Sequence, residues 1–118
     1  MGGDSGALVD RALTDTIALH EHMRQHAQPV VDAAAAISVS LRAGGKLLLF
    51  GNVVAAFEAA HALGLQAIAL TGSDGGAAGR AAAIHVNVPA VNRARVQEVH
   101  RTLLLVICDL VERSAVDA

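Results

Sequence analysis

The sequence predicts an α/β domain in which a short parallel sheet of about three strands lies between layers of helices, in a three-layer arrangement. Three observations predict it. Short apolar runs alternate with Ala-rich helical segments between residues 46 and 88, longer amphipathic segments precede and follow this region, and the connections are short. The 118 residues, 53% of them apolar, fit one domain spanning residues 1–118, with residues 1–6 as a flexible tail.

Two helices are expected before the first strand. From Ser5 to His26, apolar residues recur at helical spacing and form a broad apolar face. Pro29 ends this helix and suits the first turn of the next one, which ends at Gly44 and Gly45 because glycine readily adopts a left-handed conformation. The apolar positions are Val9, Ala12, Leu13, Ile17, Leu19 and Met23 in the first helix and Val30, Ala34, Ile37 and Leu41 in the second.

The first strand–helix–strand unit follows. Lys46 to Phe50 is a short apolar run that suits a strand buried on both faces. After Gly51, Asn52 is a good N-cap for an Ala-rich helix from Val53 to Leu63. Gly64 ends this helix, and Gln66 to Leu70 is expected to form the second strand.

A second unit completes the sheet. It consists of the loop Thr71 to Gly76, a short helix from Ala77 to Ala83 and a third strand from Ile84 to Val88. The last helix, Arg93 to Ser114, is apolar nearly all round. Its expected core face is Val96, Val99, Leu103, Val106 and Leu110, and other faces carry Leu104, Leu105, Cys108 and Val111.

Composition and charge exclude several classes of function. The net charge of −2 and the absence of Trp and Tyr leave neither a basic stripe nor stacking platforms, so direct nucleic-acid binding is not expected. No apolar run approaches the roughly 20 residues of a membrane span, and the first residues do not read as a signal peptide. Cys108 cannot form an internal disulfide and is expected to be a small buried apolar residue, which favours the cytoplasm.

Three segments carry a recognisable pattern. Ala43 to Asn52 contains a glycine-rich entry, a buried strand and a Gly-Asn turn. Val53 to Gly76 contains an Ala-rich helix, a strand and a Thr-Gly-x-Asp-Gly-Gly loop, and Val88 to His100 contains Val-Pro followed by Arg-Val-Gln-Glu-Val-His. Over nearly the whole chain from the first helix onward, the sequence resembles the phosphoheptose isomerases of the sugar-isomerase (SIS) family. The resemblance implies an SIS or flavodoxin-like fold.

The resemblance breaks at the residues that carry the family's chemistry. In the family, a Gly-Gly-Ser turn, a helix with the catalytic glutamate and a Ser-rich loop for the sugar phosphate follow the first Gly-Asn. Here Gly51-Asn52 leads directly into the helix that comes after that loop, so a block is missing. Leu105 stands where the catalytic histidine would fall, and Ala94 replaces an aspartate. Isomerisation needs a base and an acid, so we expect no catalytic residue, and we expect no cofactor.

Ligands of parallel sheets bind beyond the carboxyl ends of the strands, so any site is expected at Gly51-Asn52, Thr71 to Gly76 and Pro89 to Arg95. Asn52, Thr71 and Ser73 lie there, and Gln97 is the one residue of the family's active site that the resemblance carries over. These four residues are the candidates for contacting a sugar phosphate. The backbone of Gly72 to Gly79 offers N–H groups for an anion. The segment lacks the spacing of a Walker loop or a dinucleotide fingerprint, so a flexible turn is the favoured interpretation.

Three histidines lie close together on the first helix. His22 and His26, at i and i+4, share a face as metal ligands do, and His20 is near them. Only Glu21 is at hand to complete a ligand set. We therefore expect solvent-facing histidines and no metal site.

The leading hypothesis is an inactive SIS-type domain that serves as an oligomeric scaffold. Its apolar end helices predict a dimer or tetramer joined through Ala12 to Met23 and Leu103 to Val111. Two alternatives remain open. One is residual binding of sugar phosphates, or isomerisation of sedoheptulose 7-phosphate. The other is a protein-binding module like the family's replication initiator-associating branch, which the stretch Ile107 to Glu112 resembles.

Overall fold

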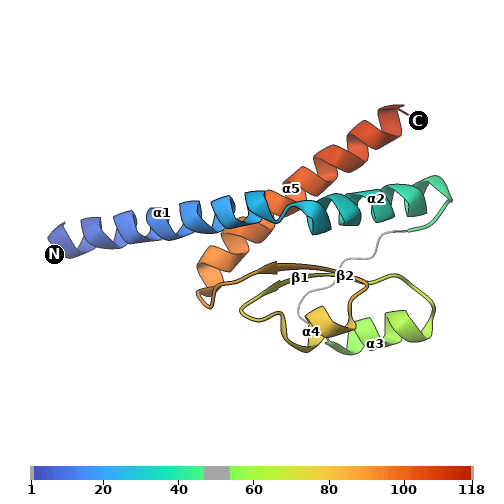
Figure 1. Cartoon of the computed structure of the whole chain (residues 1–118), viewed down its shortest axis with the longest axis horizontal. Coiled ribbons are helices and arrows are strands. Elements are labelled where there is room, and N and C mark those ends of the chain that lie inside the picture. Colours follow the sequence, from blue (N-terminus) through green and yellow to red (C-terminus); the bar gives the residue numbers. More distant parts are fainter. Residues whose placement is uncertain (1, 47–53, 118) are drawn as a thin grey trace.

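The computed structural model describes residues 2–46 and 54–117 and places five helices and two strands in them (Figure 1). In chain order these are α1 (Gly2–Gln25), α2 (Gln28–Arg42), α3 (Val54–Ala62), β1 (Ile68–Gly72), α4 (Gly76–Ala81), β2 (Ile84–Val88) and α5 (Arg93–Asp117).

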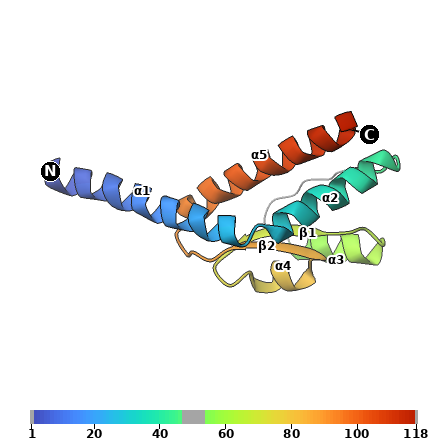
Figure 2. The ribbon, with the colours of Figure 1, turned by 45° about the horizontal axis from the view of Figure 1, so that its top comes forward.

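The two strands form a parallel pair with helices on both faces. The register places Ile68 opposite Ile84 and Gly72 opposite Val88. Helices α2 and α5 lie on one face of the pair and α4, with α3 beside it, lies on the other (Figures 1 and 2). The α/β class and the parallel pairing are therefore confirmed. The expected strand Lys46 to Phe50 lies outside the described residues apart from Lys46, so the third strand and the SIS arrangement stay predictions.

The core lies between the strand pair and the two helices that cover it. Val88 and Val99 are fully buried, and Ala33 of α2 is equally inaccessible. Small residues such as Ala33 let α2 and α5 approach each other closely. The buried cluster consists of Met23, Val30, Ala33, Ala34, Val86, Val88, Val96, Val99, Leu103 and Ile107.

Several boundaries differ from the expected ones. Helix α1 begins at Gly2, so the described part of the expected tail is helical; glycine weakens a helix without forbidding it. Strand β1 begins at Ile68 rather than Gln66, and just before it the carbonyl of Ala67 accepts hydrogen bonds from the N–H groups of Ala83 and Ile84 at the entry to β2. Helix α5 runs on to Asp117.

The amino-terminal part of α1 extends beyond the rest of the molecule (Figure 1). Its apolar residues Val9, Leu13 and Ile17 are between 57% and 66% exposed, whereas Met23 at its other end is buried. The molecule measures 55 × 35 × 22 Å, and its radius of gyration of 16.3 Å exceeds the about 13.5 Å expected for a compact chain of this length. The helix therefore uses only part of its apolar face within one chain.

Two expectations about α5 were wrong. The buried stripe continues from Leu103 to Ile107, while Val106 and Leu110, expected in the core, are exposed. Cys108, expected to be buried, is exposed as well. Both differences have one cause: α1, α2 and the strands contact α5 but do not cover the sides that carry Val106, Cys108 and Leu110. Among the described residues, no helix is both long and apolar enough to cross a membrane.

Candidate functional site

The structure describes three of the four candidate ligand-binding residues. Thr71 and Ser73 lie at the carboxyl end of β1, as expected. Gln97 is exposed on the second turn of α5. Asn52 lies outside the described residues. Of the described candidates, Thr71 and Ser73 share one strand end, and Gln97 lies on a different element.

Thr71 is held in a polar network on the sheet face that α4 covers. Its hydroxyl donates to Asn87 Oδ1 at 2.8 Å, and the His85 Nε2 lies 2.5 Å from the same oxygen. Since a hydroxyl has one proton to donate, the Thr71 oxygen accepts the second bond, which places a proton on His85 Nε2. The parallel register explains the network, because Asn87 stands opposite Thr71 and His85 opposite Ala69.

The ring of His85 packs directly on glycine backbone. A Cβ atom at either Gly75 or Gly79 would lie 2.3 Å from His85 Cε1, closer than such atoms come in proteins. Gly75 also has a φ of 88°, a conformation that favours glycine. These two glycines let the first turn of α4 lie against the imidazole.

Helix α5 closes the network from the other side. The Nε2 of His100 donates to the carbonyl oxygen of Thr71 at 2.8 Å, across 29 residues of sequence. Thr71 thus has both its hydroxyl and its carbonyl engaged within the chain. Its role in the described structure is to join β1, β2 and α5.

Ser73, directly after β1, has a strained backbone conformation. It is the non-glycine residue with positive φ (55°) in the described chain. Its N–H donates to the carbonyl of Ala90 at 2.9 Å, and its carbonyl accepts from the Asn87 side-chain amide at 3.0 Å. These bonds fix the backbone while the Ser73 side chain stays exposed.

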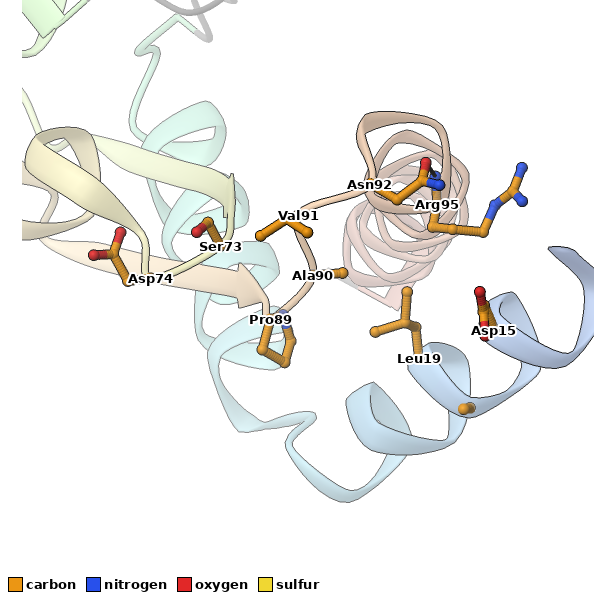
Figure 3. A pocket seen from close by; sticks show the side chains of 10 residues that line it. Asp15, Leu19, Ser73, Asp74, Pro89, Ala90, Val91, Asn92 and Arg95 are labelled. Carbon is orange, nitrogen blue, oxygen red and sulfur yellow. Dashed lines mark hydrogen bonds between the residues drawn. The ribbon is translucent and has the colours of Figure 1, made fainter. Parts of the chain in front are cut away.

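A hollow of about 640 Å³ opens beside Ser73. Figure 3 shows Arg95 and Asp15 on one side of it and Ser73 and Asp74 on the other. Helix α1, the loop after β1 and the connection from β2 to α5 contribute its lining residues: Asp15, Ala18, Leu19, Ser73, Asp74, Pro89, Ala90, Val91, Asn92 and Arg95.

Arg95 is the cationic group of this hollow. Its Nε donates to the carboxylate of Glu98, which leaves the terminal nitrogens of the guanidinium as donors for an anion. Asn92 caps α5: its Oδ1 accepts from the N–H groups of Ala94 at 3.0 Å and Arg95 at 3.3 Å. The start of α5 therefore offers an anion the side chain of Arg95 rather than these two N–H groups.

The loop weighed as an anion site uses two of its N–H groups within the chain. The N–H of Gly75 donates to the carbonyl of Gly72 at 3.0 Å, and the N–H of Gly76 donates to the Asp74 carboxylate at 3.0 Å. A phosphate at this point would have to displace a carboxylate of the same sign. The geometry here matches the alternative interpretation of the segment as a turn.

Sequence reasoning included Arg95 in one of the expected site segments without singling it out as a ligand-binding residue, and it missed Asp15. Asn92 carried a usable signal, since it follows Pro89 and directly precedes the last helix, which is where capping residues stand. No sequence signal marked Asp15, because tertiary packing places α1 beside the β2–α5 connection and no local pattern indicates it. In the part of the chain that the structure describes, no group of three or more His, Cys, Asp or Glu residues could hold a metal ion.

Curated proteins similar to this chain are named phosphoheptose isomerase. Those of Aeromonas hydrophila and Aeromonas salmonicida are 45% identical over 64 residues, which is 53% of this chain and 33% of the relative. That of Yersinia enterocolitica is 41% identical over 69 residues, 58% of this chain and 36% of the relative. The resemblance indicated by the sequence is thereby confirmed over that part of the chain.

Each match covers only part of this chain and only part of the relative. The chain spans about a third of the length of these relatives. No protein-family model matches it, and no solved structure does.

Proposed function

We propose that this chain is a shortened SIS-type domain that lacks isomerase activity and works as an oligomeric scaffold, assembled through α1 and α5. The observation that carries the proposal is the apolar surface of these two helices. Val9, Leu13 and Ile17 of α1 are exposed, as are Leu104 and Leu105 of α5. Apolar rows on this scale are typical of surfaces that meet another protein.

The positions that would carry catalysis support the proposed inactivity. Leu105, which stands where the resemblance places the catalytic histidine, is 65% exposed, and Ala94, in place of the aspartate, is also exposed. His100 lies three residues from Gln97 on α5, but its Nε2 is committed to the carbonyl of Thr71. An amide alone can neither remove nor deliver a proton between the two carbons of an aldose–ketose pair.

The assembly is tested by placing a charge in the proposed interface. Leu13→Glu should lower the mass measured by light scattering to that of one chain, because a carboxylate buried between apolar helices is strongly unfavourable. The helical signal in circular dichroism should persist, since Leu13 is exposed in the single chain. Thr14→Glu is the matched control, as Thr14 is the next residue of α1 and lies off the apolar row. Equal masses for the two variants would contradict an interface at Leu13.

Sugar-phosphate binding is a second candidate, and the hollow beside Ser73 favours it. The hollow lies at the carboxyl ends of the strands and combines the free nitrogens of Arg95 with the Ser73 hydroxyl, a cation and a donor suited to a phosphate. Asp15 and Asp74 in the same lining oppose an anion, so binding there should be weak.

Calorimetry with sedoheptulose 7-phosphate decides the second candidate. If the hollow binds the phosphate, heat should be lost in Arg95→Gln and kept in Arg93→Gln, which changes an exposed arginine of the same helix outside the hollow. Absence of heat and of thermal stabilisation at millimolar ligand would remove this candidate. Turnover of the sugar in the same samples, abolished by Gln97→Ala, would instead overturn the proposed inactivity.

A further inference from the structure

Two histidines at the end of α1 form a pair that the proposed scaffold does not use. His22 and His26 are one helical turn apart, and their rings stack with centroids 4.2 Å apart and planes 20° from parallel. His26 is exposed and His22 is half-buried. Solvent can therefore reach both rings, which is the first requirement of a site for a metal ion.

The structure fixes the tautomer of one member. The Nδ1 of His26 donates to the backbone carbonyl of His22 at 2.8 Å. Since a carbonyl can only accept, the proton of the neutral ring is on Nδ1, and the lone pair is on Nε2. Metal-binding histidines are commonly oriented in this way, by a hydrogen bond from the other ring nitrogen to a carbonyl.

The surrounding charge favours a cation. His22 is in the last turn of α1, which ends at Gln25, and His26 directly follows the helix. The carbonyl groups at a helix carboxyl terminus carry partial negative charge. Arg24, which lies between the two histidines in the sequence, is paired with the Glu21 carboxylate at 3.3 Å. The positive charge next to the pair is thus partly balanced.

The third histidine of this segment is not available to the pair. The Nδ1 of His20 donates to the carbonyl of Thr16 at 2.7 Å, and its Nε2 is 2.8 Å from the hydroxyl of Thr102 on α5. His20 therefore joins α1 to α5. A site at this place has two protein ligands, and water completes it.

We propose that His22 and His26 form a two-imidazole site for a borderline divalent metal ion of the Zn²⁺, Ni²⁺ or Cu²⁺ class, for which imidazole is a preferred ligand. In the stacked arrangement the two lone pairs do not converge, so one ring must turn. His26 is anchored, whereas the His22 ring makes no hydrogen bond within the described chain. His22 turns about its soft terminal torsion and brings a ring nitrogen to the ion held by His26 Nε2.

The test is calorimetric titration of the metal-free protein with Zn²⁺ near neutral pH. One Zn²⁺ per chain should bind, and His26→Gln, at an exposed position, should weaken binding about tenfold or more. His22→Gln should do the same. Binding should also fade as the pH drops, because only a neutral imidazole ligates a metal.

The matched control is His61→Gln, which removes an exposed histidine from α3 and should leave the affinity unchanged. The ring-proton resonances of His22 and His26 should shift with Zn²⁺ while that of His61 does not. Equal affinity in His26→Gln and the unchanged chain, or absence of saturable binding to the unchanged chain, would overturn the proposed site. Neither result would bear on the scaffold, whose interface is tested at Leu13.

Discussion

The His85 ring depends on two residues that have no side chain. Gly79 lies in α4 without unusual backbone angles, yet a Cβ there would come within 2.3 Å of His85 Cε1. The ring cannot move away freely, because Thr71 and the turn at Gly75 hold it on other sides. Gly79→Ala should therefore lower the free energy of unfolding by about 1–3 kcal/mol, although alanine is the better helix former. Urea denaturation measures the change.

A double-mutant cycle isolates the cause of that loss. In a His85→Ala background the space beside Gly79 is vacant, so Gly79→Ala should cost little or even stabilise α4. Gly6→Ala is a control on another helix, since nothing lies within 4 Å of its added Cβ. If Gly79→Ala lowers the free energy of unfolding by the same amount with and without the His85 ring, contact with that ring is not the cause of the loss.

Sequence reasoning could place single residues but not their partners. Thr71 and Ser73 were expected at the end of a strand because a buried apolar run stops there, and the structure puts them there. Their partners His85 and His100 lie 14 and 29 residues from Thr71, and no local pattern marks such contacts. Whether Thr71, Ser73 and Gln97 bind a ligand stays a prediction.

At the scale of elements, the contact between α2 and α5 depends on a small residue. Ala33 of α2 is completely buried. Ala33→Leu adds three carbons where the helices already touch, and should lower the free energy of unfolding by about 1–3 kcal/mol, as overpacking does. Ala35→Leu adds the same carbons at an exposed position of α2 and should change it by no more than about 0.5 kcal/mol. Thermal unfolding of both variants tests this; equal melting temperatures would contradict close packing at Ala33.

The elements themselves were largely predictable, because proline and glycine mark their ends. Pro29 stands in the first turn of α2, and Gly44 and Gly64 have the positive φ expected after a helix. The buried side of α5 was harder to predict. Apolar residues occur all round this helix, so periodicity could not choose Ile107 over Val106 or show that Cys108 is exposed. Which side of such a helix is buried depends on the elements that pack against it, and the sequence of the helix alone does not identify them.

For the whole molecule, the projecting half of α1 is the feature that most needs explanation. Isolated helices of about 12–15 residues are marginal in water, and helices in proteins are stabilised mainly by packing of an apolar face. The face formed by Val9, Leu13 and Ile17 has no such packing within one chain. A second copy of the chain would supply it, and closed symmetric pairs are the commonest arrangement of identical chains.

The similarity to phosphoheptose isomerases does not establish the function of the whole chain, which stays a proposal. They cover 53–58% of this chain, and the chain covers about a third of them. Their name, phosphoheptose isomerase, describes an activity of longer proteins. In this chain Leu105 stands where the resemblance places the catalytic histidine, and the segment with the catalytic glutamate has no counterpart, so shared sequence and shared chemistry need not go together.

Light scattering of the unmodified chain tests the central claim most directly. The account predicts a monodisperse species at micromolar concentration with two or four times the chain mass of 12.0 kDa, because the apolar rows of α1 and α5 must be covered. A monodisperse species of 12.0 kDa at that concentration would contradict the proposed scaffold.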